Sequence, residues 1–263
     1  MRRRAAPGRT LLLTVSLSAV FFTALAFGLK RSVLAGEGRP GADDLPLVEY
    51  PAAGGAGGDL MAVVMSGDGG WSPMDAAIGR ALSRRGIPVV GWNSLRYYWH
   101  PRSPQEASED LQRIVDAYTA RWGKPRVLVV GVSFGADALP FLVNRLPPEE
   151  KGHVAGVALL SFGRDAAFEF HLRDWLNARP PTRWHTVPEV RRLNGVPLLC
   201  IYGTNDDVTR VGCPLLKSMR AKIVEMPGGH QFGGAYGKVA RMVVPARRPA
   251  AGWEAYAVRA KVP

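Results

Sequence analysis

Short apolar runs, bounded by glycine and proline, recur along the middle of the chain. Runs of this kind are typical of strands buried on both faces of a sheet. They lie at Leu60–Met65, Pro88–Trp92, Arg126–Val130, Val154–Leu160, Val196–Tyr202 and Lys222–Met226. Between most of them the apolar spacing becomes helical, which predicts helices at Pro73–Arg85, Pro104–Trp122, Phe134–Leu146 and Tyr236–Val243. The alternation predicts an α/β fold with a mostly parallel central sheet and helices on both faces.

The N-terminal residues have a different pattern. Arg2–Arg4 and Arg9 precede an uncharged, mostly apolar stretch over residues 10–29. A basic start, an apolar middle and small residues near a cut site are typical of a secretory signal. The stretch is also long enough to remain as a membrane anchor with the body outside. We therefore expect residues 1–39 to act as a signal peptide or an N-terminal membrane anchor, with a buried N-terminal helix as the alternative.

The rest of the chain predicts one domain and a tail. Residues 40–244 are long enough for one substantial domain and short for two. Within this domain, residues 163–195 interrupt the alternation because they are rich in aromatic, arginine and proline residues. We interpret them as a small inserted cap. Residues 245–263 predict a basic, poorly ordered tail.

The net charge of +12 and the pI of about 10.2 invite a nucleic-acid interpretation. The charge, however, lies mostly at the two ends. Residues 1–39 carry a net +6 and residues 241–263 a net +4, which leaves +2 for residues 40–240. The body is nearly neutral, so we expect no nucleic-acid partner.

The two cysteines limit the possible chemistry. They exclude a disulfide-framework scaffold and a four-cysteine zinc site. In an oxidising compartment Cys200 and Cys213 can pair and fix the loop between them, with two unpaired thiols as the alternative. No cluster of metal ligands or cofactor motif is visible in the sequence, so we expect neither metal nor cofactor.

A candidate nucleophile lies in Gly131-Val132-Ser133-Phe134-Gly135, which matches G-x-S-x-G. The motif follows a predicted strand and precedes a predicted helix, which is the context of the nucleophile elbow in the α/β-hydrolase fold. A tight turn there exposes the serine oxygen, and the glycines let strand and helix approach. An ordinary glycine-rich turn is the alternative. We expect Ser133 to be the nucleophile.

The serine needs a base, and the base needs an acid that orients it. In this fold the chain order is serine, then acid, then histidine. His230, in a glycine-rich loop after the last predicted strand, is the only histidine beyond the strand that ends at Tyr202. The acid is Asp206 or Asp207, and we prefer Asp206 because it follows Gly203 by three residues.

The reaction also needs two backbone N–H groups that stabilise the oxyanion. One is expected from Phe134, directly after the nucleophile. The other is expected from the loop after the first central strand, whose sequence is SGDGGW, and we nominate Asp68 or Gly69. A simple flexible turn is the alternative for this loop.

Longer blocks carry a family resemblance. The elbow continues as GVSFGADALPF, and the upstream loop reads MSGDGGW. With RYYWHPRSP, FEFHLRDWL, LLCIYGTNDD and PGGHQF, the chain from about Leu60 to about Tyr236 resembles the VirJ/AcvB group of bacterial virulence proteins. The resemblance implies an exported α/β-hydrolase of the Gram-negative periplasm. It supports Ser133, His230 and an acid at 206 or 207, and adds Asp68 and Asp137 as signature residues.

The resemblance also implies a substrate. Members similar to AcvB hydrolyse lysyl-phosphatidylglycerol, an aminoacyl lipid ester, whereas VirJ is tied to type IV secretion. This sequence departs from the family beyond the base, where Gln231 takes the place of a second histidine. That departure changes the surroundings of the base, on which substrate preference depends.

A cationic aminoacyl group needs acidic or aromatic partners. Asp137 is one candidate, with a charge at a helix start as its alternative. The other candidates for the substrate pocket, each with core packing as its alternative, are Trp71, Tyr97, Tyr98, Trp99, Phe168, Glu169 and Phe170. We therefore expect a serine esterase acting on an aminoacyl lipid at the membrane surface. A general carboxylesterase and a non-catalytic, secretion-associated binding protein are the alternatives.

Overall fold

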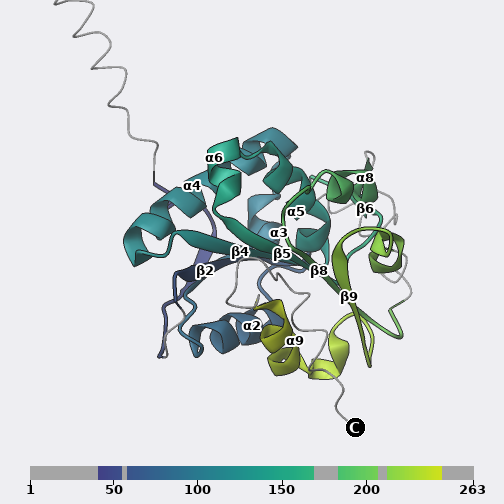
Figure 1. Ribbon diagram of the computed structural model, residues 1–263. Coiled ribbons are helices and arrows are strands. Elements are labelled where there is room, and N and C mark those ends of the chain that lie inside the picture. The colour runs from purple at the N-terminus through teal and green to yellow at the C-terminus, as the bar shows by residue number, and fades with distance from the viewer. Residues whose placement is uncertain (1–40, 55–57, 169–182, 207–211, 245–263) are drawn as a thin grey trace, which may run out of the picture. The chain divides into compact units, whose positions relative to one another are not determined.

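The computed structural model describes residues 41–54, 58–168, 183–206 and 212–244. Its main feature is a seven-stranded sheet in the order β1-β3-β2-β4-β5-β8-β9 (Figure 1). All neighbouring strands are parallel except β1, which pairs antiparallel with β3 at one edge. The strands are β1 (Leu47–Tyr50), β2 (Leu60–Met65), β3 (Val89–Trp92), β4 (Arg126–Val132), β5 (Val154–Leu160), β8 (Leu198–Gly203) and β9 (Ala221–Met226).

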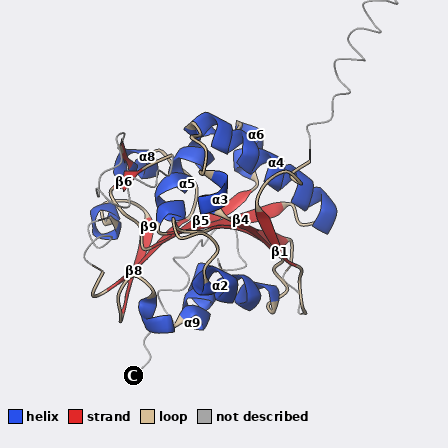
Figure 2. Cartoon of the chain, turned by 180° about the vertical axis from the view of Figure 1, so that it is seen from behind, coloured by secondary structure: helices blue, strands red, loops and turns tan. Residues whose placement is uncertain are grey.

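Helices cover both faces of this sheet. Figure 2 shows α2 and α9 on one face and α3, α4, α5, α6 and α8 on the other. The α-helices are α2 (Pro73–Ser83), α3 (Ser94–Tyr97), α4 (Pro104–Trp122), α5 (Phe134–Arg145), α6 (Pro148–Gly152), α8 (Thr186–Arg191) and α9 (Tyr236–Val243). Two 3-10 turns follow the late strands, η1 (Cys213–Leu216) and η2 (Phe232–Gly234). The predicted α/β architecture is therefore confirmed.

Local sequence signals explain where α2 and α4 begin. The hydroxyl of Ser72 accepts the N–H of Asp75, and the Asp75 carboxylate accepts the N–H of Ser72. Ser103 and Glu106 form the same reciprocal box at the start of α4. Each box satisfies N–H groups that the first turn leaves without a partner. Because a proline follows each serine, both helices start as the sequence predicts.

The alternation of side chains along the strands divides the core in two. In β2, Met61, Val63 and Met65 pack under α4 and α5. Leu60, Ala62 and Val64 pack on the opposite face with α2 and α9. Every residue of β2 is buried, as expected for a strand covered by helices on both faces.

Strand β1 is absent from the sequence-based prediction. Its four residues, LVEY, are mostly half-buried, and the strand pairs on one side only. The apolar run that marks a central strand is therefore missing. Two further two-residue strands, β6 (Asp165–Ala166) and β7 (Trp184–His185), pair with each other outside the main sheet.

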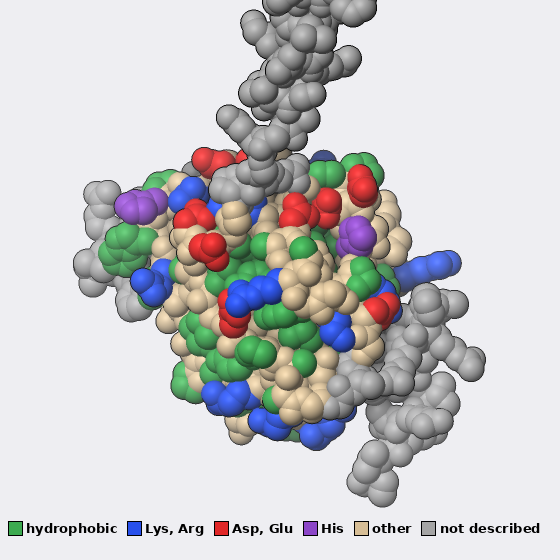
Figure 3. Space-filling model, turned by 90° about the vertical axis from the view of Figure 1, so that its left-hand side faces the viewer, with side chains coloured by type: hydrophobic (Ala, Val, Ile, Leu, Met, Phe, Trp, Pro, Cys, Tyr) green, Lys and Arg blue, Asp and Glu red, His purple; other side chains and the backbone are tan. Residues whose placement is uncertain are grey.

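Charged side chains of both signs occupy the surface. On the described residues of the face in Figure 3, Lys and Arg side chains lie among Asp and Glu side chains. This mixture agrees with the nearly neutral charge of the body. Whole-chain pI is therefore a poor description of the folded domain.

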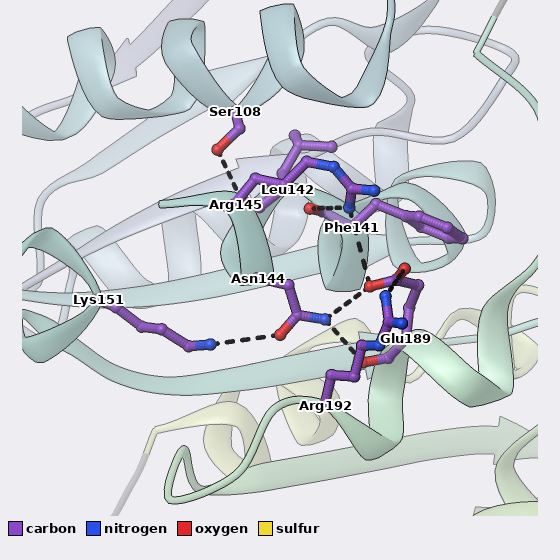
Figure 4. A network of polar contacts seen from close by, with 8 residues as sticks. All are labelled: Ser108, Phe141, Leu142, Asn144, Arg145, Lys151, Glu189 and Arg192. Atoms are coloured by element: carbon purple, nitrogen blue, oxygen red, sulfur yellow. Dashed lines mark hydrogen bonds and ion pairs between the residues drawn. The ribbon is translucent and has the colours of Figure 1, made fainter. Parts of the chain in front are cut away.

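A polar network fastens α8 to α5 (Figure 4). Asn144 Nδ2 donates to both the backbone oxygen and the carboxylate of Glu189, at 2.8 Å each. Arg192 lies 3.0 Å and Arg145 3.8 Å from the Glu189 carboxylate. The network joins the end of the segment predicted as a cap to the helix behind the nucleophile motif. Residues 169–182 of that segment lie outside the described residues, so the cap remains a prediction.

Candidate active site

Ser133 occupies a strained turn between β4 and α5. Its φ of 51° and ψ of −118° are unusual for a residue with a side chain. The Ser133 N–H donates to the backbone oxygen of Leu160 at 2.8 Å, and the backbone oxygen of Ser133 accepts the N–H of Asp137 at 3.1 Å. These bonds hold the turn in the geometry that a nucleophile elbow requires.

The two glycines of the motif are required by close packing. A Cβ at Gly131 would lie 2.5 Å from the backbone of Ala136, at the start of α5. A Cβ at Gly135 would overlap the backbone oxygen of Met65, at the end of β2. Glycine therefore lets the first turn of α5 pack directly against both strands, which is the steric role that the sequence motif predicts.

Asp206 and His230 lie together at the carboxyl end of the sheet. The distance between His230 Nδ1 and Asp206 Oδ2 is 2.9 Å. The Asp206 side chain is buried, whereas 41% of the His230 side chain is exposed. A carboxylate accepts only, so Nδ1 donates and Nε2 is left as the nitrogen that can accept a proton. The alternative acid, Asp207, lies outside the described residues.

The loops that carry the acid and the base pack on each other. The N–H of Asn205 donates to the backbone oxygen of Gly228 at 3.0 Å. A Cβ at Gly203 would overlap the backbone oxygen of Gly229. The base loop also contacts Ser161, whose hydroxyl donates to the backbone oxygen of His230 at 2.9 Å. Ser161 is absent from the residues predicted from the sequence, because no motif surrounds it.

The loop after β2 runs beside the nucleophile. A Cβ at Gly67 would lie 3.4 Å from the Cβ of Ser133. Gly67 also accepts the N–H of Gly70 at 3.1 Å, which closes a tight turn around Asp68 and Gly69. The structure therefore places the turn next to Ser133, and the assignment of its oxyanion donor, like that of Phe134, stays a prediction.

Most of the aromatic candidates for the substrate pocket lie in the core. Trp71 covers Gly91 with its ring and donates to the hydroxyl of Tyr50 at 3.0 Å. Tyr97 is buried and donates to Asp110 at 2.6 Å. These contacts match the core-packing alternative.

The remaining candidates differ in exposure. Tyr98 and Phe168 are buried, and their ring centroids lie 5.9 Å apart. Trp99 is 57% exposed. Glu169 and Phe170 lie outside the described residues, so their role in the pocket stays a prediction.

Asp137 lies one turn after Ser133 on α5. Its Oδ1 accepts the N–H of Gly163 at 2.7 Å. Burial raises the pKa of Asp137 well above its ordinary value, and the carboxylates of Asp165 and Asp68 raise it further, against the lowering effect of the Gly163 hydrogen bond. The environment of this carboxyl group therefore favours its protonated form.

A disulfide joins Cys200 on β8 to Cys213 at the start of η1. The two Cα atoms are 5.6 Å apart, and both residues are fully buried. Asp206 lies between them in the sequence, so the bond closes the loop that carries the candidate acid.

The described residues contain neither a candidate metal site nor a candidate membrane span. No group of three or more His, Cys, Asp or Glu side chains in this part of the chain is arranged to hold a metal ion. None of its helices combines the length and the hydropathy needed to span a bilayer. The predicted signal or anchor at residues 1–39 lies outside this part of the chain.

Comparison with solved structures identifies the fold. The esterase Est1E from Butyrivibrio proteoclasticus, with ferulic acid bound, is similar with a TM-score of 0.52 at 14% identity, over 77% of this chain and 94% of that one. A serine hydrolase homologue from Coxiella burnetii has a TM-score of 0.51 at 16% identity, over 75% and 89%. The thioesterase domain of the curacin pathway has a TM-score of 0.53 at 13% identity, over 75% and 94%. The chain therefore has the predicted α/β-hydrolase fold.

Sequence comparison identifies the family. None of the curated proteins compared with the chain shows a significant match. The family model described as "Bacterial virulence protein (VirJ)" matches residues 59–250, which include β2 to α9 and all three candidate catalytic residues. The match agrees with the resemblance of the SGDGGW and SFGADALP blocks, and the chain belongs to the VirJ family of bacterial virulence proteins.

Proposed function

We propose that this protein is a serine hydrolase that cleaves an ester with Ser133, His230 and Asp206. The observation that supports this most is the 2.9 Å contact between His230 and the buried Asp206, in a fold whose elbow turn presents Ser133. An acid that orients a histidine, beside an activated serine, is the arrangement that acyl transfer needs.

The proposed reaction has two steps. The Ser133 hydroxyl attacks the ester carbonyl while His230 Nε2 accepts its proton, and backbone N–H groups stabilise the oxyanion. The same proton then passes to the departing alcohol, which leaves an acyl group on Ser133. A water molecule, deprotonated by His230, releases the carboxylic acid and restores the serine. Asp206 holds the imidazole in orientation throughout.

The proposed substrate is an aminoacyl ester of phosphatidylglycerol, and lysyl-phosphatidylglycerol is the leading candidate. The proposed place of the reaction is the outer side of the inner membrane. Membership of the VirJ family and the export pattern of residues 1–39 support this proposal. The carboxyl group of Asp68, in the turn beside Ser133, is a suitable partner for an ammonium group. Asp137 is a weaker candidate, because its burial favours the protonated form. A contact with a secretion system is a further proposal from the family alone.

A general carboxylesterase is the second candidate. The esterase and thioesterase names of the similar structures favour it. A non-catalytic binding protein has less support, because it would need neither a strained serine in an elbow turn nor a histidine oriented by a buried acid.

A fluorophosphonate probe tests the proposed chemistry. Labelling of the wild-type protein, lost in Ser133→Ala, is the expected result. A folded wild-type protein that the probe does not label would overturn the proposal.

Vesicles containing lysyl-phosphatidylglycerol test the proposed substrate. We expect release of free lysine by the wild-type protein and none by Ser133→Ala. If the protein hydrolyses p-nitrophenyl acetate but releases no lysine, the general carboxylesterase is the correct function.

A further inference from the structure

The residues at the end of β5 contact the loops of the nucleophile and the base. We call Leu160–Gly163 the β5 turn. Its Leu160 oxygen accepts the N–H of Ser133 at 2.8 Å. Its Ser161 hydroxyl donates to the backbone oxygen of His230 at 2.9 Å. One short segment therefore bonds to both residues that must exchange a proton.

The same turn also contacts the strand and the loop of the acid. The Ser161 N–H donates to the backbone oxygen of Ile201 on β8 at 2.8 Å. The next residue, Phe162, packs closely on Gly212. A Cβ at position 212 would overlap the backbone oxygen of Phe162. The β5 turn is thus fixed against the loop that carries Asp206.

Ser161 itself adopts a costly conformation. It is fully buried and has a φ of 54°. For a residue with a side chain this conformation costs about 1 kcal/mol or more, and glycine would adopt it more easily. Glycine, however, has no hydroxyl to bond the carbonyl of His230. Serine at position 161 adopts the positive φ of the turn and also supplies the hydroxyl that bonds the His230 carbonyl.

We propose that Ser161 is a positioning residue that sets the place of His230 relative to Ser133. This inference rests on the proposed function. The Asp206 carboxylate fixes the orientation of the imidazole ring, whereas Ser161 fixes the backbone from which the ring projects. Without the Ser161 hydroxyl the base loop shifts while His230 stays paired with Asp206, and Nε2 is displaced from the nucleophile.

The test compares Ser161→Ala and Ser161→Gly with Ser108→Ala. Ser108 is a matched control, because its buried hydroxyl also donates to a backbone oxygen, that of Leu142, at 2.8 Å, but between α4 and α5. With p-nitrophenyl acetate, both Ser161 variants should lose about tenfold to a hundredfold in kcat, since small misplacements have effects of this size. KM should stay within about twofold, and Ser108→Ala should keep the wild-type kcat.

Melting curves and probe labelling complete the experiment. Ser161→Gly relieves the backbone strain, so its melting temperature should be no lower than that of Ser161→Ala. Its kcat should nevertheless remain low, because the hydroxyl is missing. The rate of fluorophosphonate labelling of Ser133 should fall in parallel with kcat.

Three outcomes would overturn the inference. A wild-type kcat in Ser161→Ala is one. An equal loss of kcat in Ser108→Ala is the second, because the effect would then follow from stability alone. If the probe does not label even the wild-type protein, the proposed function fails first, and this inference fails with it.

Discussion

Backbone strain in the described residues gathers around the candidate site. Three residues with side chains have positive φ there, Ser133, Ser161 and Phe232. Ser133 is the candidate nucleophile, Ser161 bonds the carbonyl of the candidate base, and Phe232 follows that base by two residues. Strain of this kind persists only where the surrounding structure holds it, and it is common at catalytic sites.

Ser133→Gly separates the two roles of the serine. Glycine adopts the turn without strain, so the free energy of unfolding should exceed that of Ser133→Ala by about 1 kcal/mol. Both variants should lose at least about a thousandfold in ester hydrolysis, because neither has a nucleophile. Denaturant titration measures the first effect and ester hydrolysis the second. Equal stability of the two variants would contradict the argument from strain.

Asp137→Asn should change stability in a pH-dependent way. In the unfolded chain this carboxyl ionises near its ordinary pKa, 3.8, and in the folded protein well above it. As pH rises between these values, the unfolded state loses its proton first, so folding loses stability. Asparagine keeps an acceptor for the Gly163 N–H without that loss.

Thermal melting between pH 4 and pH 8 measures this effect. Asp137→Asn should melt at least about 2 °C above the wild-type protein at neutral pH. The difference should shrink steadily as the pH falls toward 4, because the unfolded state then also holds this proton for a growing fraction of the time. A difference that does not depend on pH would show that the carboxyl charge is not its cause.

The sequence predicts residues that belong to a motif or to a chain order, and misses residues whose role depends on neighbours. Ser133, Asp206 and His230 follow from the elbow motif and the order of strands. Ser161 could not be nominated, because its contacts come from β8 and from a loop 69 residues further along the chain. The buried state of Tyr98 likewise depends on helices that the local sequence does not define.

At the scale of elements, the central strands and long helices are predictable because each has its own signal. The apolar run of β2 and the capped start of α4 coincide with the predicted bounds. Strand β1 has no such signal, since it is short and pairs on one side only. The place of η1 likewise depends on a covalent bond, which the sequence left open between a disulfide and two thiols.

That disulfide predicts how much the acid loop contributes to stability. Its loop spans 13 residues, and closing a loop of this size stabilises a protein by about 2–4 kcal/mol. The variant Cys200→Ala with Cys213→Ala should lose about this much in denaturant titration. Its kcat should fall as well, because Asp206 lies within the freed loop. Unchanged stability would mean that packing alone holds η1 in place.

At the scale of the whole molecule, the disulfide and the N-terminal segment predict the same compartment. A disulfide persists in an oxidising environment, and residues 1–39 have the pattern of an export signal or anchor. We therefore propose that the nearly neutral body works outside the cytoplasm. The excess positive charge belongs to the two ends of the chain.

Blocking export should therefore change the thiols. In Leu17→Arg with Phe21→Arg, two charges interrupt the apolar stretch, so the protein should stay in the cytoplasm. A thiol-reactive label, applied after denaturation without reductant, should then modify both cysteines, whereas it should modify neither in the exported wild-type protein. Fractionation of the cells gives the location independently. Free thiols in the wild-type protein from the periplasmic fraction would contradict this prediction.

The position of β9 has a consequence for biosynthesis. This strand closes one edge of the sheet, and the loop that follows it carries His230. The nucleophile turn, by contrast, is built from β4 and α5, nearly a hundred residues earlier. A nascent chain can therefore form the turn around Ser133 long before a base exists beside it. The proposed hydrolysis therefore requires the final strand to have docked, so we expect an unfinished chain to be inactive.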